Sequence, residues 1–189
     1  MDELSLYVLD ITMNSVRAGA REIGISLIDD GEWLTFSVVD DGCGMSAEQV
    51  ERLSNPFFTT RKTRKVGLGV PFLTMLAEMT GGGVKIVSTP ESESEEHGTT
   101  ITAKFNKGHI DFIPLGDIVS TVTTLIQGSP DVNFTFVHEM PDGRVELSCK
   151  ALREMLGDEI SLAEPEILSW IGGYLNEQYA EISSEDAQN

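Results

Sequence analysis

The sequence predicts an α+β fold in which a layer of helices covers a mixed, largely antiparallel sheet. One observation supports this fold class, and a second one divides the chain into two parts. Helical and strand-like patterns follow one another over residues 4–105 in the order helix, strand, strand, helix, basic loop, helix, strand, strand. The charge changes near Gly108, because residues 1–108 contain 10 basic and 16 acidic residues and residues 109–189 contain 3 and 15. We therefore expect a first domain over 1–107, a small α+β domain over 108–182 and a disordered tail over 183–189.

Each element of the first part has a local signal. Apolar residues at helical spacing predict the first helix, and the alternation of Ile23, Ile25 and Leu27 predicts the first strand of a hairpin. Ser46 and Gln49 have the spacing of a capping box, which predicts a short helix after them. The expected elements are a helix over 4–16, strands over 23–27 and 33–39, a helix over 47–53, a helix over 68–80, and strands over 84–88 and 99–105.

The second part shows the same kinds of signal. A turn over 141–143 with the sequence Pro-Asp-Gly separates two strand-like segments, which predicts a hairpin. The expected elements are a helix over 118–126, strands over 133–138 and 144–148, and helices over 152–156 and 165–179.

Composition excludes several classes of protein. The hydrophobic content of 40% and the mean hydropathy of −0.06 are typical of a globular protein, and we find no uninterrupted apolar run long enough for a membrane span. The net charge of −18 disfavours nucleic acids and anionic membranes as ligands. The first ten residues lack the basic and apolar regions of a signal peptide, so we expect a cytoplasmic protein. Cys43 and Cys149 stand far apart, which favours neither a disulfide framework nor a zinc site, and we expect Cys43 to be packed.

The first predicted helix contains three polar residues that share one face. Asp10, Asn14 and Arg17 follow one another at spacings of four and three residues. An amide oxygen can bind Mg²⁺ beside phosphate oxygens, and a carboxylate one turn away can orient or deprotonate a water or hydroxyl. A solvated polar face is the alternative, and Arg17 has the weakest claim to a role.

A segment with the sequence Asp-Asp-Gly-Cys-Gly-Met follows the predicted hairpin at residues 40–45. Its glycines, Gly42 and Gly44, allow the backbone to turn sharply and to approach a flat ligand. Asp40 can accept a hydrogen bond from an exocyclic amine such as that of adenine, which would select the base. An ordinary turn is the alternative interpretation of this pattern in isolation.

Two further segments complete the pattern. Gly67, Leu68 and Gly69 immediately precede a predicted helix, whose free N–H groups attract phosphate. Before them, the stretch 56–65 has four basic residues, which indicates either a solvated loop or a mobile lid that meets phosphates. The second of the two segments is Gly98 with the threonines after it, and this signal is weak in isolation.

These segments together resemble the sequence boxes of the superfamily of ATPases that includes DNA gyrase, the heat-shock chaperones, the sensor histidine kinases and MutL. The resemblance covers residues 4–106 and implies a Bergerat fold, a two-layer α/β sandwich that binds ATP with Mg²⁺. It implies that Asn14 binds the metal, that Asp40 binds adenine, and that Asp10 stands where many members have a glutamate base. The whole chain also resembles small ATP-binding proteins encoded near iron hydrogenases in anaerobic bacteria, which implies no defined activity. The residues that we expect to bind the nucleotide are Asn14, Arg17, Asp40, Gly42, Gly44, Met45, Thr60, Lys62, Gly67, Leu68, Gly69, Thr99 and Thr100.

Three functions remain open. The first is an ATP- and Mg²⁺-dependent regulatory switch with slow or no hydrolysis, which acts on a protein partner. The second is a protein kinase that phosphorylates a serine, threonine or histidine of a partner, with Asp10 as the catalytic base. The third is an interaction module with a degenerate nucleotide pocket. Autophosphorylation of the sensor kinase type is disfavoured, because none of the 13 residues before Asn14 is a histidine.

Overall fold

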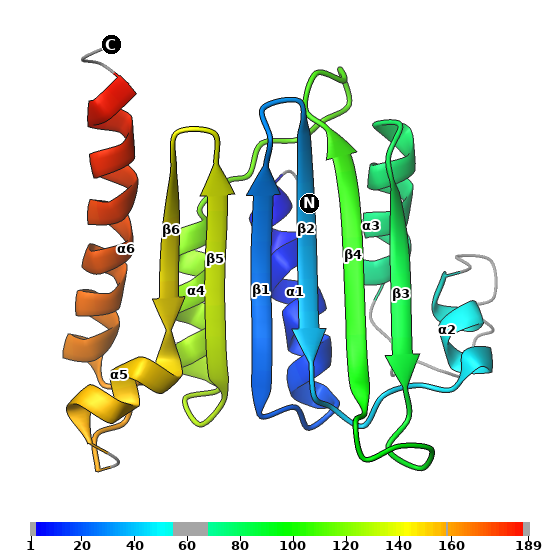
Figure 1. The fold of residues 1–189 in the computed structure, drawn as a ribbon, viewed down its shortest axis with the longest axis horizontal. Helices are drawn as coiled ribbons and strands as arrows, with labels where there is room; N and C mark the ends of the chain where they lie inside the picture. Colours follow the sequence, from blue (N-terminus) through cyan, green and yellow to red (C-terminus); the bar gives the residue numbers. More distant parts are fainter. Residues whose placement is uncertain (1–2, 55–67, 158, 187–189) are drawn as a thin grey trace.

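The computed structural model describes residues 3–54, 68–157 and 159–186, and these residues form one six-stranded sheet covered by helices (Figure 1). The strand order is β3-β4-β2-β1-β5-β6. Neighbouring strands are antiparallel except β1 and β5, which are parallel. The strands are β1 (Glu22–Asp29), β2 (Trp33–Asp40), β3 (Gly83–Thr89), β4 (Gly98–Asn106), β5 (Asn133–Met140) and β6 (Gly143–Ser148). The prediction of an α+β fold with a mixed, mostly antiparallel sheet is confirmed.

Three helices cover one face of this sheet, and Figure 1 shows them behind the strands. They are α1 (Leu4–Arg17), α3 (Gly69–Met79) and α4 (Ile118–Gly128). The other helices are α2 (Ala47–Ser54), which lies beside the lower part of β3, α5 (Cys149–Leu156), which follows the lower end of β6, and α6 (Pro165–Asp186), which lies beside β6. None of the helices in the described ranges covers β1, β2 and β4 on the opposite face, which we call the open face.

The alternation of side chains along each strand explains why one face of the sheet is buried and the other is exposed. Ile23, Ile25 and Leu27 of β1 are at most 2% exposed and point to the helices, as the sequence predicted. On the open face, Val39 of β2 is 50% exposed. The helix-covered face therefore contains the hydrophobic core. Burial of apolar surface there stabilises the fold by about 25 cal/mol per Å².

The start of α2 confirms the predicted capping box. The backbone N–H of Ser46 donates to Oε1 of Gln49 at 2.8 Å, and the backbone N–H of Gln49 donates to Oγ of Ser46 at 3.3 Å. Each side chain therefore satisfies a backbone donor that the first helical turn leaves free.

The second half of the chain continues the same sheet. We expected a separate small α+β domain over 108–182, but β5 pairs with β1 and places Phe134 and Phe136 beside Ile23 and Ile25. All four side chains belong to one buried cluster. The predicted elements of this half form, and β5 and β6 extend the sheet of the first half. The charge step at Gly108 is a property of the surface, and it contains no information about which strand edge the later strands fill.

Helix α6 is attached to β5 and β6 by polar contacts. The hydroxyl of Tyr179 and Nδ1 of His138 are 2.8 Å apart, and burial lowers the pKa of His138 and raises that of Tyr179, so both side chains are neutral at pH 7. Gln178 accepts from the backbone N–H of Glu146 at 3.0 Å and donates to its carbonyl at 3.1 Å. The side-chain amide of Gln178 thus pairs with backbone groups at the outer edge of β6, as the backbone of a further strand would.

The end of α6 differs from the expectation of a disordered tail from Ser183. The helix extends to Asp186, and residues 187–189 lie outside the described residues. Ser183 and Ser184 donate from their hydroxyls to the carbonyls of Tyr179 and Glu181 at 3.0 and 2.8 Å. These bonds satisfy the serine hydroxyls within the helix, which composition alone did not indicate.

Candidate nucleotide-binding site

Asp40, the last residue of β2, is 9% exposed and is fixed by three donors. The hydroxyl of Ser15 in α1 donates to Oδ2 at 2.5 Å. Oδ1 accepts from the backbone N–H of Gly42 at 2.9 Å and of Thr99 in β4 at 3.3 Å. Donors from three parts of the chain, α1, the loop after β2 and β4, therefore hold one carboxylate in place. A buried charge that is held in this way is preorganised to recognise a ligand donor.

The loop after Asp40 is attached to the neighbouring strand ends. The backbone N–H of Met45 donates to the hydroxyl of Ser88 at 2.8 Å. Nδ1 of His97 lies 2.6 Å from the carbonyl oxygen of Gly42. Gly44 has a φ of +67°, which agrees with the sharp turn that the glycine spacing predicted. The residues Gly42, Gly44 and Met45 thus lie next to Asp40, where the sequence predicted them.

The polar face of α1 runs from Asp40 towards the beginning of α3. Asn14 directly precedes Ser15, and its Oδ1 accepts from the Arg17 guanidinium at 3.0 Å. Asp10 lies one turn earlier, and both Asp10 and Asn14 are half-buried whereas Arg17 is exposed. Asp10, Asn14 and Arg17 therefore share one face of α1, as their spacing predicted.

Helix α3 begins directly against Asp10. A Cβ on Gly69 would lie 1.9 Å from Oδ2 of Asp10, so a side chain at position 69 would displace the Asp10 carboxylate from this place. Leu68, which precedes the helix, is 57% exposed. Free N–H groups at the start of a helix attract negative charge, and the carboxylate of Asp10 lies beside Gly69 at this start. The described part of the predicted glycine turn is therefore next to the predicted base.

The first two threonines of β4, Thr99 and Thr100, lie on opposite faces of the sheet. Thr99 pairs with Asp40, is 9% exposed and shares a hydrogen bond of 2.8 Å with the hydroxyl of Ser88. Thr100 pairs with Val39 on the open face. The structure therefore places Thr100 on the face of the sheet opposite to Thr99 and the carboxylate of Asp40, because neighbouring residues of a strand alternate between faces.

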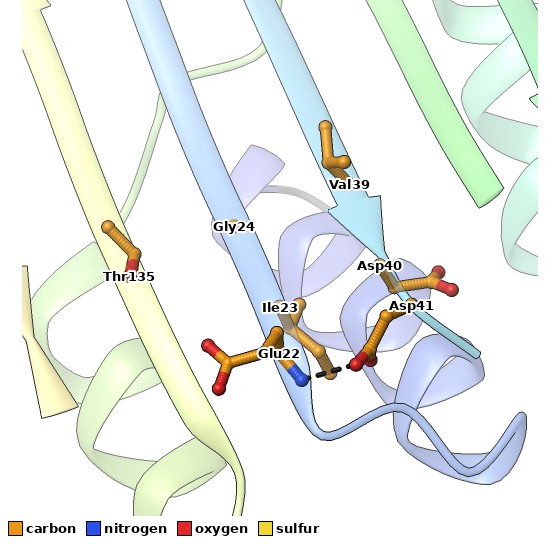
Figure 2. Close-up of a pocket in the computed structure, with 7 residues that line it drawn as sticks. All are labelled: Glu22, Ile23, Gly24, Val39, Asp40, Asp41 and Thr135. Atoms are coloured by element: carbon orange, nitrogen blue, oxygen red, sulfur yellow. Dashed lines mark hydrogen bonds between the residues drawn. The ribbon is translucent and has the colours of Figure 1, made fainter. Parts of the chain in front are cut away.

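A shallow hollow of about 300 Å³ lies behind this site on the open face, lined by Glu22, Ile23, Gly24, Val39, Asp40, Asp41 and Thr135. Figure 2 shows the carboxylate of Asp40 directed away from Glu22 and Thr135, and that of Asp41 directed to the backbone N–H of Glu22. The hollow is thus separate from the side of Asp40 that faces α1.

The comparisons with known proteins agree with this geometry. The family model described as "Histidine kinase-, DNA gyrase B-, and HSP90-like ATPase" matches residues 2–109. The chain belongs to this ATPase family. Residues 2–109 are its ATP-binding domain, as the sequence boxes predicted, whereas α4, β5, β6, α5 and α6 lie wholly beyond the match.

Curated relatives of this ATPase family cover the same part of the chain. Sensor histidine kinase ZraS of Escherichia coli K12 is 29% identical over 103 residues, which are 53% of this chain and 21% of the kinase. Sporulation kinase B of Bacillus subtilis is 30% identical over 105 residues, 54% of this chain and 23% of the kinase. Nitrogen regulation protein NtrY of Azorhizobium caulinodans is 31% identical over 86 residues, 46% of this chain and 11% of that protein. The chain thus spans about a fifth or less of their length.

Solved structures show the same fold over a longer stretch. The Aquifex aeolicus MutL ATPase domain complexed with ADP is 16% identical, has a TM-score of 0.55, and aligns over 82% of this chain and 67% of that domain. The N-terminal domain of a DNA repair protein is 20% identical, has a TM-score of 0.56, and aligns over 78% of this chain and 53% of that structure. At these identities the likeness concerns the fold alone, the Bergerat sandwich of the ATPase family.

Three of the predicted nucleotide-binding residues of this ATPase domain, Thr60, Lys62 and Gly67, lie outside the described residues. Within the described ranges, no group of three or more His, Cys, Asp or Glu residues could hold a metal ion. A magnesium site built from one amide oxygen and phosphate oxygens needs no such group. Across the same ranges, none of the helices combines the length and apolarity that a bilayer crossing requires.

Sequence reasoning missed the residues that support Asp40. Ser15, which donates to Asp40, and Ser88, which holds the loop after it, have no motif of their own. His97 contacts the carbonyl oxygen of Gly42 in the same loop. The one available signal for Ser15 was its place on a helix beside Asn14. Cys43 also differs from expectation, because its side chain is exposed rather than packed.

The second cysteine is buried. Cys149 begins α5, and burial raises the pKa of its thiol to about 11. Its thiolate is therefore scarce at neutral pH, and both cysteines are free, as their separation in the sequence suggested.

Proposed function

We propose that the chain is an ATP- and Mg²⁺-dependent regulatory switch with slow or no hydrolysis, which acts through a protein partner. One observation supports the proposal most strongly. Helix α1 contacts both parts of the candidate site, because its Ser15 bonds to Asp40 and its Asp10 meets Gly69 at the start of α3. A nucleotide with its base at Asp40 and its phosphates at α3 would lie along the polar face of this helix.

Asp40 suits the role of base recognition. Its two oxygens are already held by three protein donors, so an adenine amine would meet a fixed acceptor with no rotamer entropy left to lose. Guanine presents a carbonyl oxygen at the corresponding position of its ring. Two acceptors would then face each other, so the carboxylate would select adenine over guanine.

Asn14 suits the role of metal ligand. Its amide oxygen is half-buried on the face of α1 that Asp10 shares, and it is held by the guanidinium of Arg17. Mg²⁺ supplies charge neutralisation for the phosphates and prefers one or two protein oxygens beside water and phosphate. Arg17 would have to yield this oxygen to the metal and would remain available for an anionic group.

Slow hydrolysis follows from the place of Asp10. Its carboxylate lies against the start of α3, and its side chain is one methylene shorter than the glutamate that many members have at this position. A carboxylate held back against the helix reaches an attacking water poorly, and catalysis is sensitive to such displacement.

The same contact gives the switch a physical basis. Asp10 places negative charge at the helix end where the phosphates would bind. Asp10 must shift or share that end when a phosphate arrives, so nucleotide binding would change how α1 and α3 pack. Any partner that contacts one of these helices would sense the change in packing.

Substitution of Asn14 by alanine tests the metal role. We expect Mg²⁺ to raise the ATP affinity of the unaltered protein and to leave that of Asn14→Ala nearly unchanged, because the variant lacks the protein ligand of the metal. Isothermal titration with ATP, with and without Mg²⁺, measures this difference. Asn176→Ala, another exchange in a helix, is the matched control, since Asn176 is exposed on α6. Equal Mg²⁺ dependence in Asn14→Ala and in the control would remove the role of Asn14, and no ATP binding by the unaltered protein would leave only the interaction module.

Phosphorylation of a partner in trans is the second candidate, and the kinases among the relatives favour it. Incubation of the protein with radiolabelled ATP and an extract of its native cells distinguishes it from the switch. For the switch we expect no labelled partner. A partner that the unaltered protein labels, and that Asp10→Asn does not label while still binding ATP, would support the kinase and overturn the proposal of a switch without phosphate transfer.

A further inference from the structure

A groove of about 500 Å³ lies where α5 and α6 meet β5 and β6, and it has no role in the candidate nucleotide site. Val137 and Glu146 line it from the strands, Met155 from α5, and Trp170 and Tyr174 from α6. All of these residues lie beyond residue 109, the last residue that the ATPase family model matches. The groove therefore belongs to the part of the chain that the family does not explain.

The wall formed by α6 presents two stacked aromatic rings. Trp170 and Tyr174 are one helical turn apart, with ring centroids 5.1 Å apart and an angle of 7° between the ring planes. Their side chains remain 51% and 37% exposed, and Met155 across the groove is 73% exposed. Aromatic and methionine side chains that gather around a hollow on the surface are typical of interaction sites.

The charge around these rings is negative. Arg144 lines the groove but is paired with Glu139 at 3.0 Å and with Glu146 at 2.9 Å, so two carboxylates face one cation. On α6, Glu166 and Glu177 stand four residues before Trp170 and three after Tyr174, on the same side of the helix. Residues 109–189 contain 15 acidic and only 3 basic residues, so the surroundings favour a cationic ligand.

We propose that this groove binds an extended, basic segment of a partner protein, with an arginine or lysine on the face of the stacked rings and an apolar side chain between Met155 and Val137. Cations are attracted to aromatic faces within about 6 Å of the ring centre, and the carboxylate of Glu146 adds an ionic partner. A second copy of the chain is a poor occupant, because each copy has a net charge of −18. Nucleic acids and anionic membranes are disfavoured for the same reason.

The path of such a segment follows from a shared residue. Thr135 lines both this groove and the hollow behind Asp40. An extended segment anchored at Trp170 can therefore cross β5 on the open face towards the end of β2, on the side of the sheet opposite to the nucleotide. The proposal does not depend on nucleotide binding, and it holds whether the ATPase domain is a switch or a kinase.

Fluorescence anisotropy with a labelled peptide of alternating arginine and leucine tests the proposal. A matched peptide with glutamate in place of every arginine controls for apolar adsorption. We expect the basic peptide to bind the unaltered protein, the acidic peptide not to bind, and affinity to fall as salt is added. Replacement of both rings, Trp170→Ala with Tyr174→Ala, should weaken binding about tenfold or more, equivalent to about 1.4 kcal/mol.

Matched variants separate the groove from general attraction to an acidic surface. Phe72→Ala removes a ring of similar exposure (42%) from α3, and Glu51→Gln removes a charge from α2 as Glu146→Gln does from the groove. Only the groove variants should lose affinity, with thermal unfolding by circular dichroism unchanged in all of them. The proposal is overturned by no binding of the basic peptide, by equal losses in groove and control variants, or by a dimer in sedimentation that requires the two rings.

Discussion

Asp40→Asn should weaken ATP binding by about 10- to 100-fold and leave GTP affinity unchanged or slightly higher, as expected for the loss of a charge-assisted hydrogen bond of about 1.5–3 kcal/mol. The amide can still accept from the backbone N–H groups of Gly42 and Thr99, and its NH₂ group can donate to Ser15. The fold is therefore preserved. The NH₂ group cannot accept from an adenine amine, and it can donate to the carbonyl of guanine.

Isothermal titration of both nucleotides into both proteins measures this change of preference. Asp41→Asn is the matched control, because Asp41 accepts from the backbone N–H groups of Arg21 and Glu22 at 2.7 and 2.9 Å and faces the opposite side of the sheet end. It removes the same charge one residue away, so general electrostatic effects appear in both variants. Equal loss of ATP and GTP affinity, or the same loss in Asp41→Asn, would contradict the role of Asp40.

Local signals predicted the elements that surround the nucleotide site. Alternation in β1 and the capping box of α2 each depend on residues close together in the sequence, and the structure has both. The glycines after Asp40 predicted a turn, and Gly44 has the positive φ that such a turn requires. These features follow from backbone sterics and hydrogen bonding within a few residues, which is the information that one sequence contains.

Features that depend on distant residues were not predicted. The parallel pairing of β1 with β5 joins Ile23 to Phe134, and no local pattern says which strand edge a later strand will fill. The support of Asp40 by Ser15 and Thr99 is of the same kind, since it joins three segments far apart in the sequence. The pairing of Thr100 with Val39 is a third example, because it decides which face of the sheet Thr100 occupies.

Gly98→Ala should destabilise the protein by about 3 kcal/mol, which lowers Tm by about 6–12 °C for a chain of this size. Gly98 begins β4 with a φ of +137°, a conformation that L side chains rarely adopt. A Cβ there would lie 1.9 Å from the carbonyl oxygen of Asp40 and 3.1 Å from Cα of Asp41. Both contacts are with backbone, so no rotamer change relieves them.

The same substitution should also reduce ATP affinity, because the clash pushes apart the ends of β2 and β4 that hold Asp40. The hydrogen bond from Thr99 to Asp40 would lengthen first, since at 3.3 Å it is already the longest of the three. Gly83→Ala is the matched control in the adjacent strand, as a Cβ there meets nothing within 4 Å. Thermal unfolding and ATP titration of both variants distinguish the two sites. A Gly98→Ala protein as stable as Gly83→Ala would mean that the strand ends tolerate a side chain, and the close packing behind Asp40 would then not be what fixes its carboxylate.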